Sequence, residues 1–184
     1  MRITRALISG ALLVTFACNA SNAGGSVSEV ERNRELILNS YLKKYKELGA
    51  CMLEASRLFD VPEWIVYATV YHERGPINGS LLNPNGTRDW GPSGINDVRL
   101  MDYERMGVRI TGEQIAQNPC IGIRITGHLM RIEYDKLPNN QKNWLTAAGN
   151  YHYNKKGRYP HNHYKYVNHI TTALERFQKT ISQK

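Results

Sequence analysis

The sequence predicts a mainly α-helical single domain with one long irregular loop. Apolar residues recur at helical spacing through most of the chain. The stretch 62–73 is apolar almost all round, which is typical of a helix buried at the centre of a domain. Residues 77–112 instead carry Asn-Gly and Gly-Pro steps that mark turns. A connection of this length inside a small domain is usually functional, so we expect a substrate loop there, with at most a small strand ribbon.

The first 23 of the 184 residues have the pattern of a secretory signal peptide. Two arginines precede an apolar run over residues 6–17, which is too short to span a bilayer. Small residues follow, so we expect cleavage after Ala23, with Ala20 as the alternative position. A lipoprotein attached through Cys18 and a buried N-terminal helix are the other interpretations. The pattern predicts an exported protein of the periplasm.

Charge and cysteine content agree with export. The net charge of +8 falls to +6 when the two arginines of the leader are removed. A basic surface suits anionic polymers or acidic peptides, and nothing in the sequence resembles a nucleic-acid-binding module. Outside the leader two of the three cysteines remain, Cys51 and Cys120. An even pair in an exported protein predicts a disulfide, worth about 4 kcal/mol for a loop of about 70 residues, with two free thiols as the alternative.

The chain divides into an extension, residues 24–49, and a domain, residues 50–184. The extension is rich in Glu, Lys, Arg and Leu, which predicts a surface helix over residues 26–48. Gly49 is expected to interrupt that helix before the next one begins.

The domain begins with a helix over residues 50–59. Asp60 is placed to cap the next helix, with Pro62 in its first turn. Gly75-Pro76 is expected to end that helix. Further helices are expected at residues 97–106, 120–137, 143–154 and 164–181.

Glu73 is the residue on which the chemistry depends. It lies at the carboxyl end of the most apolar helix, with Val66, Thr69 and Val70 as helical neighbours. Burial and the negative end of the helix dipole both disfavour an ionised carboxylate, so both raise its pKa. A carboxyl group that is protonated near neutral pH can serve as a general acid toward a glycosidic oxygen. A solvated glutamate, or one paired with Arg74, is the alternative interpretation.

Short motifs follow one another in order along the chain. They are Phe59-Asp60-Val61-Pro62, Glu73-Arg74-Gly75, the Asn-rich turn at 83–91, Ile95-Asn96, Asn118-Pro119-Cys120-Ile121, and Ala147-Ala148 with Tyr153-Asn154. Over residues 50–170 their order and spacing resemble the goose-lysozyme-like lytic transglycosylases. In that family a helix ends in Glu-Ser-Gly, and an Asn-rich turn and a Gln-Ile-Asn segment follow.

The resemblance implies a lysozyme-like fold and cleavage of peptidoglycan without water. Glu73 would protonate the oxygen between N-acetylmuramic acid and N-acetylglucosamine. It would then take the proton of the muramyl 6-hydroxyl as a 1,6-anhydro ring closes. No cofactor is required. The substrate-binding residues implied are Ser93, Ile95, Asn96, Tyr153 and Asn154, with Tyr151 as the alternative to Tyr153. Ser93 and Asn96 can also be ordinary turn residues, and Tyr153 a core residue.

The sequence departs from the family pattern at two positions. Arg74 stands where the family has Ser, and Gly94 stands where it has Gln. The pair Cys51 and Cys120 resembles the cysteine pattern of transglycosylases attached to type IV secretion, conjugation or pilus systems. The partners implied are therefore peptidoglycan strands and, in addition, components of such a machine.

Two other functions remain open at the level of sequence. A hydrolytic muramidase needs a second carboxylate, for which Asp89 and Asp97 lie in the right loop. A glycan-binding assembly factor would need Glu73 only as a structural residue. We expect no metal site, because Pro76 stands where the zinc-protease motif that begins at His72 needs its second histidine. The histidines His152, His161, His163 and His169 are more simply a polar cluster than ligands.

Overall fold

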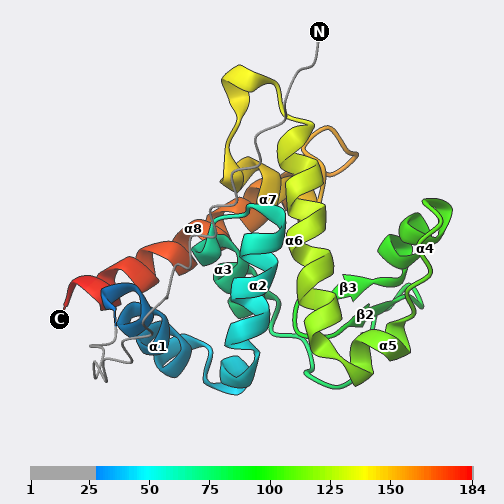
Figure 1. Ribbon diagram of the computed structural model, residues 1–184. Helices are drawn as coiled ribbons and strands as arrows, with labels where there is room; N and C mark the ends of the chain where they lie inside the picture. Colours follow the sequence, from blue (N-terminus) through cyan, green and yellow to red (C-terminus); the bar gives the residue numbers. More distant parts are fainter. Residues whose placement is uncertain (1–27, 184) are drawn as a thin grey trace, which may run out of the picture.

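The computed structural model describes residues 28–183. The expected signal peptide, with Cys18 and both cleavage positions, lies outside the described residues. The described chain is mainly helical, as predicted, with a small antiparallel sheet (Figure 1). Its helices are α1 (Glu29–Tyr41), α2 (Gly49–Phe59), α3 (Glu63–Glu73), α4 (Asp97–Arg105), α5 (Gly112–Gln117), α6 (Pro119–Asp135), α7 (Trp144–His152) and α8 (Pro160–Ser182). The remaining elements are the 3-10 segments η1 (Lys43–Leu48) and η2 (Asn139–Gln141) and the strands β1 (Ser80–Leu82), β2 (Arg88–Trp90) and β3 (Ile95–Asn96). Within this range no helix is both long and apolar enough to cross a membrane.

Helix α3 is the centre of the helical part of the molecule. It contacts α2, α6, α7 and α8, and every residue from Ile65 to Val70 is buried. This confirms the prediction drawn from its all-round apolar sequence, because a helix can bury all its faces only when neighbours surround it. The carboxyl end of α3 therefore opens at the junction of several elements.

Helices α2 and α6 pack along each other and are joined by the predicted disulfide. The bond links Cys51 to Cys120, whose Cα atoms lie 5.3 Å apart across 69 positions of sequence. Asn118 fixes the start of α6 because its side chain accepts a hydrogen bond from the backbone N–H of Cys120.

The helix expected over residues 26–48 is divided at Leu42. Helix α1 ends before it and the 3-10 segment η1 follows. The expected surface position is also only half right, because Ile37 and Leu42 are fully buried and belong to the same core as the rest of the domain. Gly49 does not interrupt a helix, since its backbone is helical and it begins α2.

The expectation that Asp60 caps α3 is wrong. Asp60 ends α2 in a left-handed conformation (φ 50°), and its carboxylate accepts a hydrogen bond from Arg131. Pro62 is the N-cap of α3 and makes no capping hydrogen bond with its side chain. The reason is the extended backbone that a residue before proline prefers, which separates the two helices at Val61.

The long loop folds around a three-stranded antiparallel sheet of order β1-β2-β3. Leu81 pairs with Asp89, and Trp90 pairs with Ile95. Helix α4 matches its prediction, whereas α5 was not predicted. Figure 1 shows the sheet, α4 and α5 to the right of α6, and α1 and α8 to its left. Strand β3 and α5 contact α6, so the sheet is fixed against the helical part.

Candidate active site

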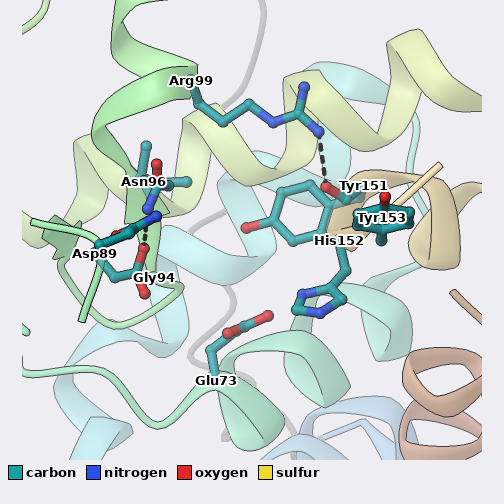
Figure 2. Close-up of a pocket in the computed structure, with 10 residues that line it drawn as sticks. Glu73, Asp89, Gly94, Asn96, Arg99, Tyr151, His152 and Tyr153 are labelled. Atoms are coloured by element: carbon teal, nitrogen blue, oxygen red, sulfur yellow. Dashed lines mark hydrogen bonds between the residues drawn. The ribbon is translucent and has the colours of Figure 1, made fainter. Parts of the chain in front are cut away.

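A cleft of about 450 Å³ opens above the carboxyl end of α3. It is lined by Glu73, Asn85, Asp89, Gly94, Ile95, Asn96, Arg99, Tyr151, His152 and Tyr153. In Figure 2, Asp89, Gly94 and Asn96 lie on one side, and Tyr151, His152 and Tyr153 on the other, with the Glu73 carboxyl group between them. The Arg99 guanidinium donates a hydrogen bond to the backbone oxygen of Tyr151 (3.0 Å), which joins α4 to α7 above the cleft.

At the end of α3, the backbone contacts the loop between β2 and β3 beside Glu73. Helix α3 ends at Glu73, as expected, and its C-cap is Arg74, which has a left-handed backbone (φ 51°). Gly75 has another role: a Cβ atom there would lie 2.0 Å from the backbone oxygen of Gly91, which is far inside contact distance. Because it has no side chain, its N–H can donate to the oxygen of Pro92 (3.2 Å). The loop is thereby held beside the Glu73 carboxyl.

Glu73 is a partly buried acid with one strong hydrogen-bond donor. The buried Tyr166 hydroxyl donates a hydrogen bond to its Oε1 atom over 2.7 Å. Burial raises the pKa of Glu73 to about 7, which the Tyr166 hydrogen bond opposes and the charge of Asp89 reinforces. Burial wins because a single hydrogen bond cannot replace the hydration that the carboxylate has lost. Both the protonated and the ionised forms of Glu73 are therefore accessible near neutral pH.

The second carboxyl oxygen lies under Gly94. The backbone of Gly94 is left-handed (φ 63°), and a Cβ atom on it would lie 3.2 Å from Oε2 of Glu73. A glutamine at this position would be strained, and its side chain would begin against the carboxyl group. Glycine at position 94 therefore leaves room above Oε2, while Oε1 accepts from Tyr166.

We predict that Gly94→Ala lowers activity on the order of tenfold, because the methyl group crowds the oxygen that faces the cleft. The left-handed backbone adds about 1 kcal/mol of destabilisation. Gly107→Ala is the matched control: it has the same strain (φ 81°) with nothing within 4 Å of the new Cβ atom. Initial rates measure the activity of the two variants, and melting curves measure their stability. An equal loss of activity in both variants would show that backbone strain alone causes the effect.

Two histidine rings pack against Tyr166, the residue that donates the hydrogen bond to Glu73. The His152 ring stacks on Tyr166 at 4.5 Å, and His72 meets the same ring edge-on at 5.0 Å. Burial lowers the pKa of His152, and it lowers the pKa of His72 to about 4. Both rings are therefore mainly uncharged at neutral pH, so they supply no positive charge that would favour the ionised form of Glu73.

We predict that Tyr166→Phe shifts the pH profile upward. The hydroxyl lowers the pKa of Glu73, so its removal raises that pKa further and moves the alkaline loss of kcat/KM to higher pH. The stability cost is about 1 kcal/mol for the lost hydrogen bond. Tyr103→Phe removes another buried hydroxyl, on α4, and should leave the profile unchanged. An unmoved profile in Tyr166→Phe would contradict the assignment.

The two aspartates of the loop differ in position. Asp97 does not line the cleft, and its carboxylate accepts hydrogen bonds from the backbone N–H of Arg88 and from the indole N–H of Trp90, both at 2.6 Å. Asp89 lines the cleft and accepts one hydrogen bond from the Asn96 amide at 2.7 Å. Asp97 is thus a structural residue of the sheet, whereas Asp89 faces the same space as Glu73.

The structure brings some of the expected site residues together and separates others. Ile95, Asn96 and Tyr153 line the cleft with Glu73. Ser93 is fully buried away from it, and its hydroxyl has no hydrogen-bond partner among the described residues. Asn154 is exposed, and its side chain accepts from the backbone N–H of the turn that follows.

Tyr151 and Tyr153 both line the cleft, so the open choice between them becomes a difference of role. The buried Tyr151 hydroxyl donates to the Ser93 oxygen (3.0 Å) and holds the loop before Gly94. The Tyr153 hydroxyl accepts from the backbone N–H of Tyr159 (3.0 Å), so its ring is fixed at the rim.

Asn85, Arg99 and His152 line the cleft, although the sequence analysis did not assign them to the site. It also missed Tyr166, which is outside the cleft lining and donates to Glu73. Tyr166 belongs to the buried stripe of α8 with Ile170, Ala173 and Phe177, so its spacing indicates a core residue and nothing more. Its partner lies 93 positions away in sequence. No local pattern can indicate such a pair.

Fold and site together define a mainly helical protein with a partly buried, protonatable carboxyl group in a polar cleft. Within residues 28–183 no group of three or more His, Cys, Asp or Glu side chains can hold a metal ion. No protein-family model matches the chain, and a search of curated proteins finds no significant match.

Proposed function

We propose that this protein is a peptidoglycan lytic transglycosylase with a lysozyme-like fold and with Glu73 as its acid and base. One observation carries the proposal: Glu73 lines the cleft with a pKa raised to about 7. Its Oε1 atom accepts from Tyr166, and its Oε2 atom lies beside Gly94, which also lines the cleft. The order of motifs around Glu73 supports the same conclusion.

The two states of Glu73 suit the two steps of this reaction. Protonated Glu73 gives its proton to the glycosidic oxygen as the bond to the anomeric carbon of N-acetylmuramic acid breaks. The resulting carboxylate then takes the proton of the muramyl 6-hydroxyl, whose oxygen closes the 1,6-anhydro ring. A group with a pKa near the working pH can serve in both directions. Tyr166 supports the carboxylate between the steps because it donates to Oε1.

The lining of the cleft suits a sugar chain. The Asn85 amide and the Arg99 guanidinium offer hydrogen-bond donors to hydroxyl and N-acetyl oxygens. Asn96 lines the same space, but both of its amide N–H bonds are directed at Thr87 and Asp89. Tyr153 and His152 add ring faces on the opposite wall. Concave sites with a few fixed polar groups and aromatic faces are typical of small-molecule and oligosaccharide recognition.

A hydrolytic muramidase is the second candidate, and the position of Asp89 favours it. Asp89 lines the cleft and is close enough to raise the pKa of Glu73. It would serve as nucleophile or as base toward water. We rank it second because Asp89 already accepts a hydrogen bond from Asn96, and because ring closure needs no second carboxylate.

We propose further that the protein acts in the periplasm, at a secretion, conjugation or pilus machine that must pass through the wall. The Cys51–Cys120 disulfide fits a compartment outside the cytoplasm. The net positive charge fits an anionic wall.

A gel with embedded peptidoglycan gives the first test of this function. The purified protein should clear the gel at its own band, and clearing should weaken as the pH rises through about 7, where Glu73 loses its proton. A folded protein that binds peptidoglycan but leaves its band uncleared would contradict the enzyme and favour a binding protein.

A further inference from the structure

A second concave surface lies beside the end of α3. It consists of two adjoining hollows of about 380 and 310 Å³ that share Tyr71 and Arg74. The first hollow continues along α8 to Arg176, and the second continues to Lys44 on η1. We call the surface formed by Lys44, Tyr71, Arg74 and Arg176 the basic groove. Neither hollow shares a lining residue with the Glu73 cleft, so the basic groove is a separate feature.

Tyr71 holds the two arginines of the groove in place. The Arg74 guanidinium lies 4.8 Å from the centre of the Tyr71 ring, and its Nε atom donates to the Tyr71 backbone oxygen (3.0 Å). Arg176 donates to the Tyr71 hydroxyl (3.1 Å). The other N–H groups of each guanidinium are left for a ligand, on a side chain that is already ordered.

The charges of the groove have no acidic partners in the described part of the chain. No Asp or Glu lines either hollow, and Lys44, Arg74 and Arg176 form no ion pair within residues 28–183. Other arginines do pair with carboxylates, namely Arg34, Arg99, Arg105, Arg109, Arg124 and Arg131. Three unpaired cations along one concave surface therefore indicate an anionic ligand.

We propose that the basic groove binds the acidic stem peptide of the peptidoglycan strand that enters the cleft. Two joined hollows suit an extended chain better than a single small anion, and arginine binds carboxylates with two parallel hydrogen bonds. Arg74 directly follows Glu73, so peptide and glycan of one strand meet the same helix end. The inference rests on the proposed function. It also gives a role to Arg74, at the position where the resemblance implied a serine.

The test measures binding and needs no catalysis. A labelled stem peptide with free carboxylates is titrated against the full chain carrying Glu73→Gln, and fluorescence anisotropy gives Kd. Adding Arg176→Glu should weaken binding at least about fivefold, because it removes a cation and places a like charge in the groove. Lys44→Glu is the second variant, in case the first one misfolds. Arg57→Glu, an exposed change of equal charge on α2 outside both hollows, should leave Kd unchanged.

The outcomes separate this inference from the proposed function. Loss of binding in Arg176→Glu but not in Arg57→Glu, together with no binding of the peptide amidated at its carboxylates, supports the groove. Equal Kd values in the two variants overturn it. A glutamate oligomer that binds as tightly as the stem peptide also overturns it, in favour of an acidic protein partner. A protein that cleaves no wall but binds the peptide at the groove would contradict the proposed function alone.

Discussion

Replacement of Glu73 by glutamine is expected to reduce wall cleavage by about 10²- to 10⁴-fold, the usual contribution of a general acid. Glutamine keeps the shape of the side chain and can accept the Tyr166 hydrogen bond, but it has no proton to give at neutral pH. The measurement is the initial rate of release of soluble fragments from purified peptidoglycan. Glu63→Gln, at the other end of α3 and paired with Arg34, is the control that should retain activity.

The same substitution is expected to stabilise the protein at alkaline pH. The pKa of Glu73 is raised from 4.5 to about 7 in the folded state, so folding favours the protonated form. The stability of the native protein is therefore greatest below about pH 4.5 with respect to this group, and it declines until the pH passes about 7. Above that pH the ionised carboxylate costs on the order of 3 kcal/mol, which glutamine avoids. Chemical denaturation at pH 4 and pH 8 should show a higher free energy of unfolding for Glu73→Gln than for the native protein only at pH 8.

Retained wall cleavage by the Glu73→Gln variant would exclude Glu73 as the acid.

Loss of the Cys51–Cys120 disulfide is expected to be the largest single change in stability. The bond closes a loop over 69 positions, which corresponds to about 4 kcal/mol in the chain-entropy model. The double variant Cys51→Ser, Cys120→Ser should therefore melt roughly 8–16 °C lower than the oxidised protein. Thermal unfolding followed by circular dichroism measures this shift.

The reduced native protein is the control for the serine side chains. It should melt near the temperature of the double variant, because both lack the link between α2 and α6. Activity at low temperature should be kept in both, since neither cysteine lines the Glu73 cleft. An unchanged melting temperature on reduction would contradict the claim that the disulfide stabilises the protein by restricting the unfolded chain.

The elements with a strong sequence signal were predictable. Helix α3 is apolar on every side, and Cys51 and Cys120 are the two cysteines outside the expected leader. The weaker signals failed where packing decided the structure. Residues 26–48 look like one charged helix, but the chain divides at Leu42, which is fully buried in the core. Helix α5 has only six residues, too few for a periodic pattern to be recognised.

The candidate site was only partly predictable for a related reason. Glu73, Ile95 and Asn96 lie in short local motifs, so their positions in the sequence indicated them. Tyr166 acts across the fold, and Ser93 carries a polar side chain that the packing of the loop turned inward. Sequence spacing contains no information on either event, because both depend on which elements meet in three dimensions.

Mass spectrometry of the products released from peptidoglycan tests the central claim most directly. The proposed reaction predicts fragments that end in 1,6-anhydro-N-acetylmuramic acid, lighter by one water than hydrolysis products, and it predicts that they disappear with Glu73→Gln. Products with reducing ends alone would contradict ring closure and would transfer the second catalytic role to Asp89.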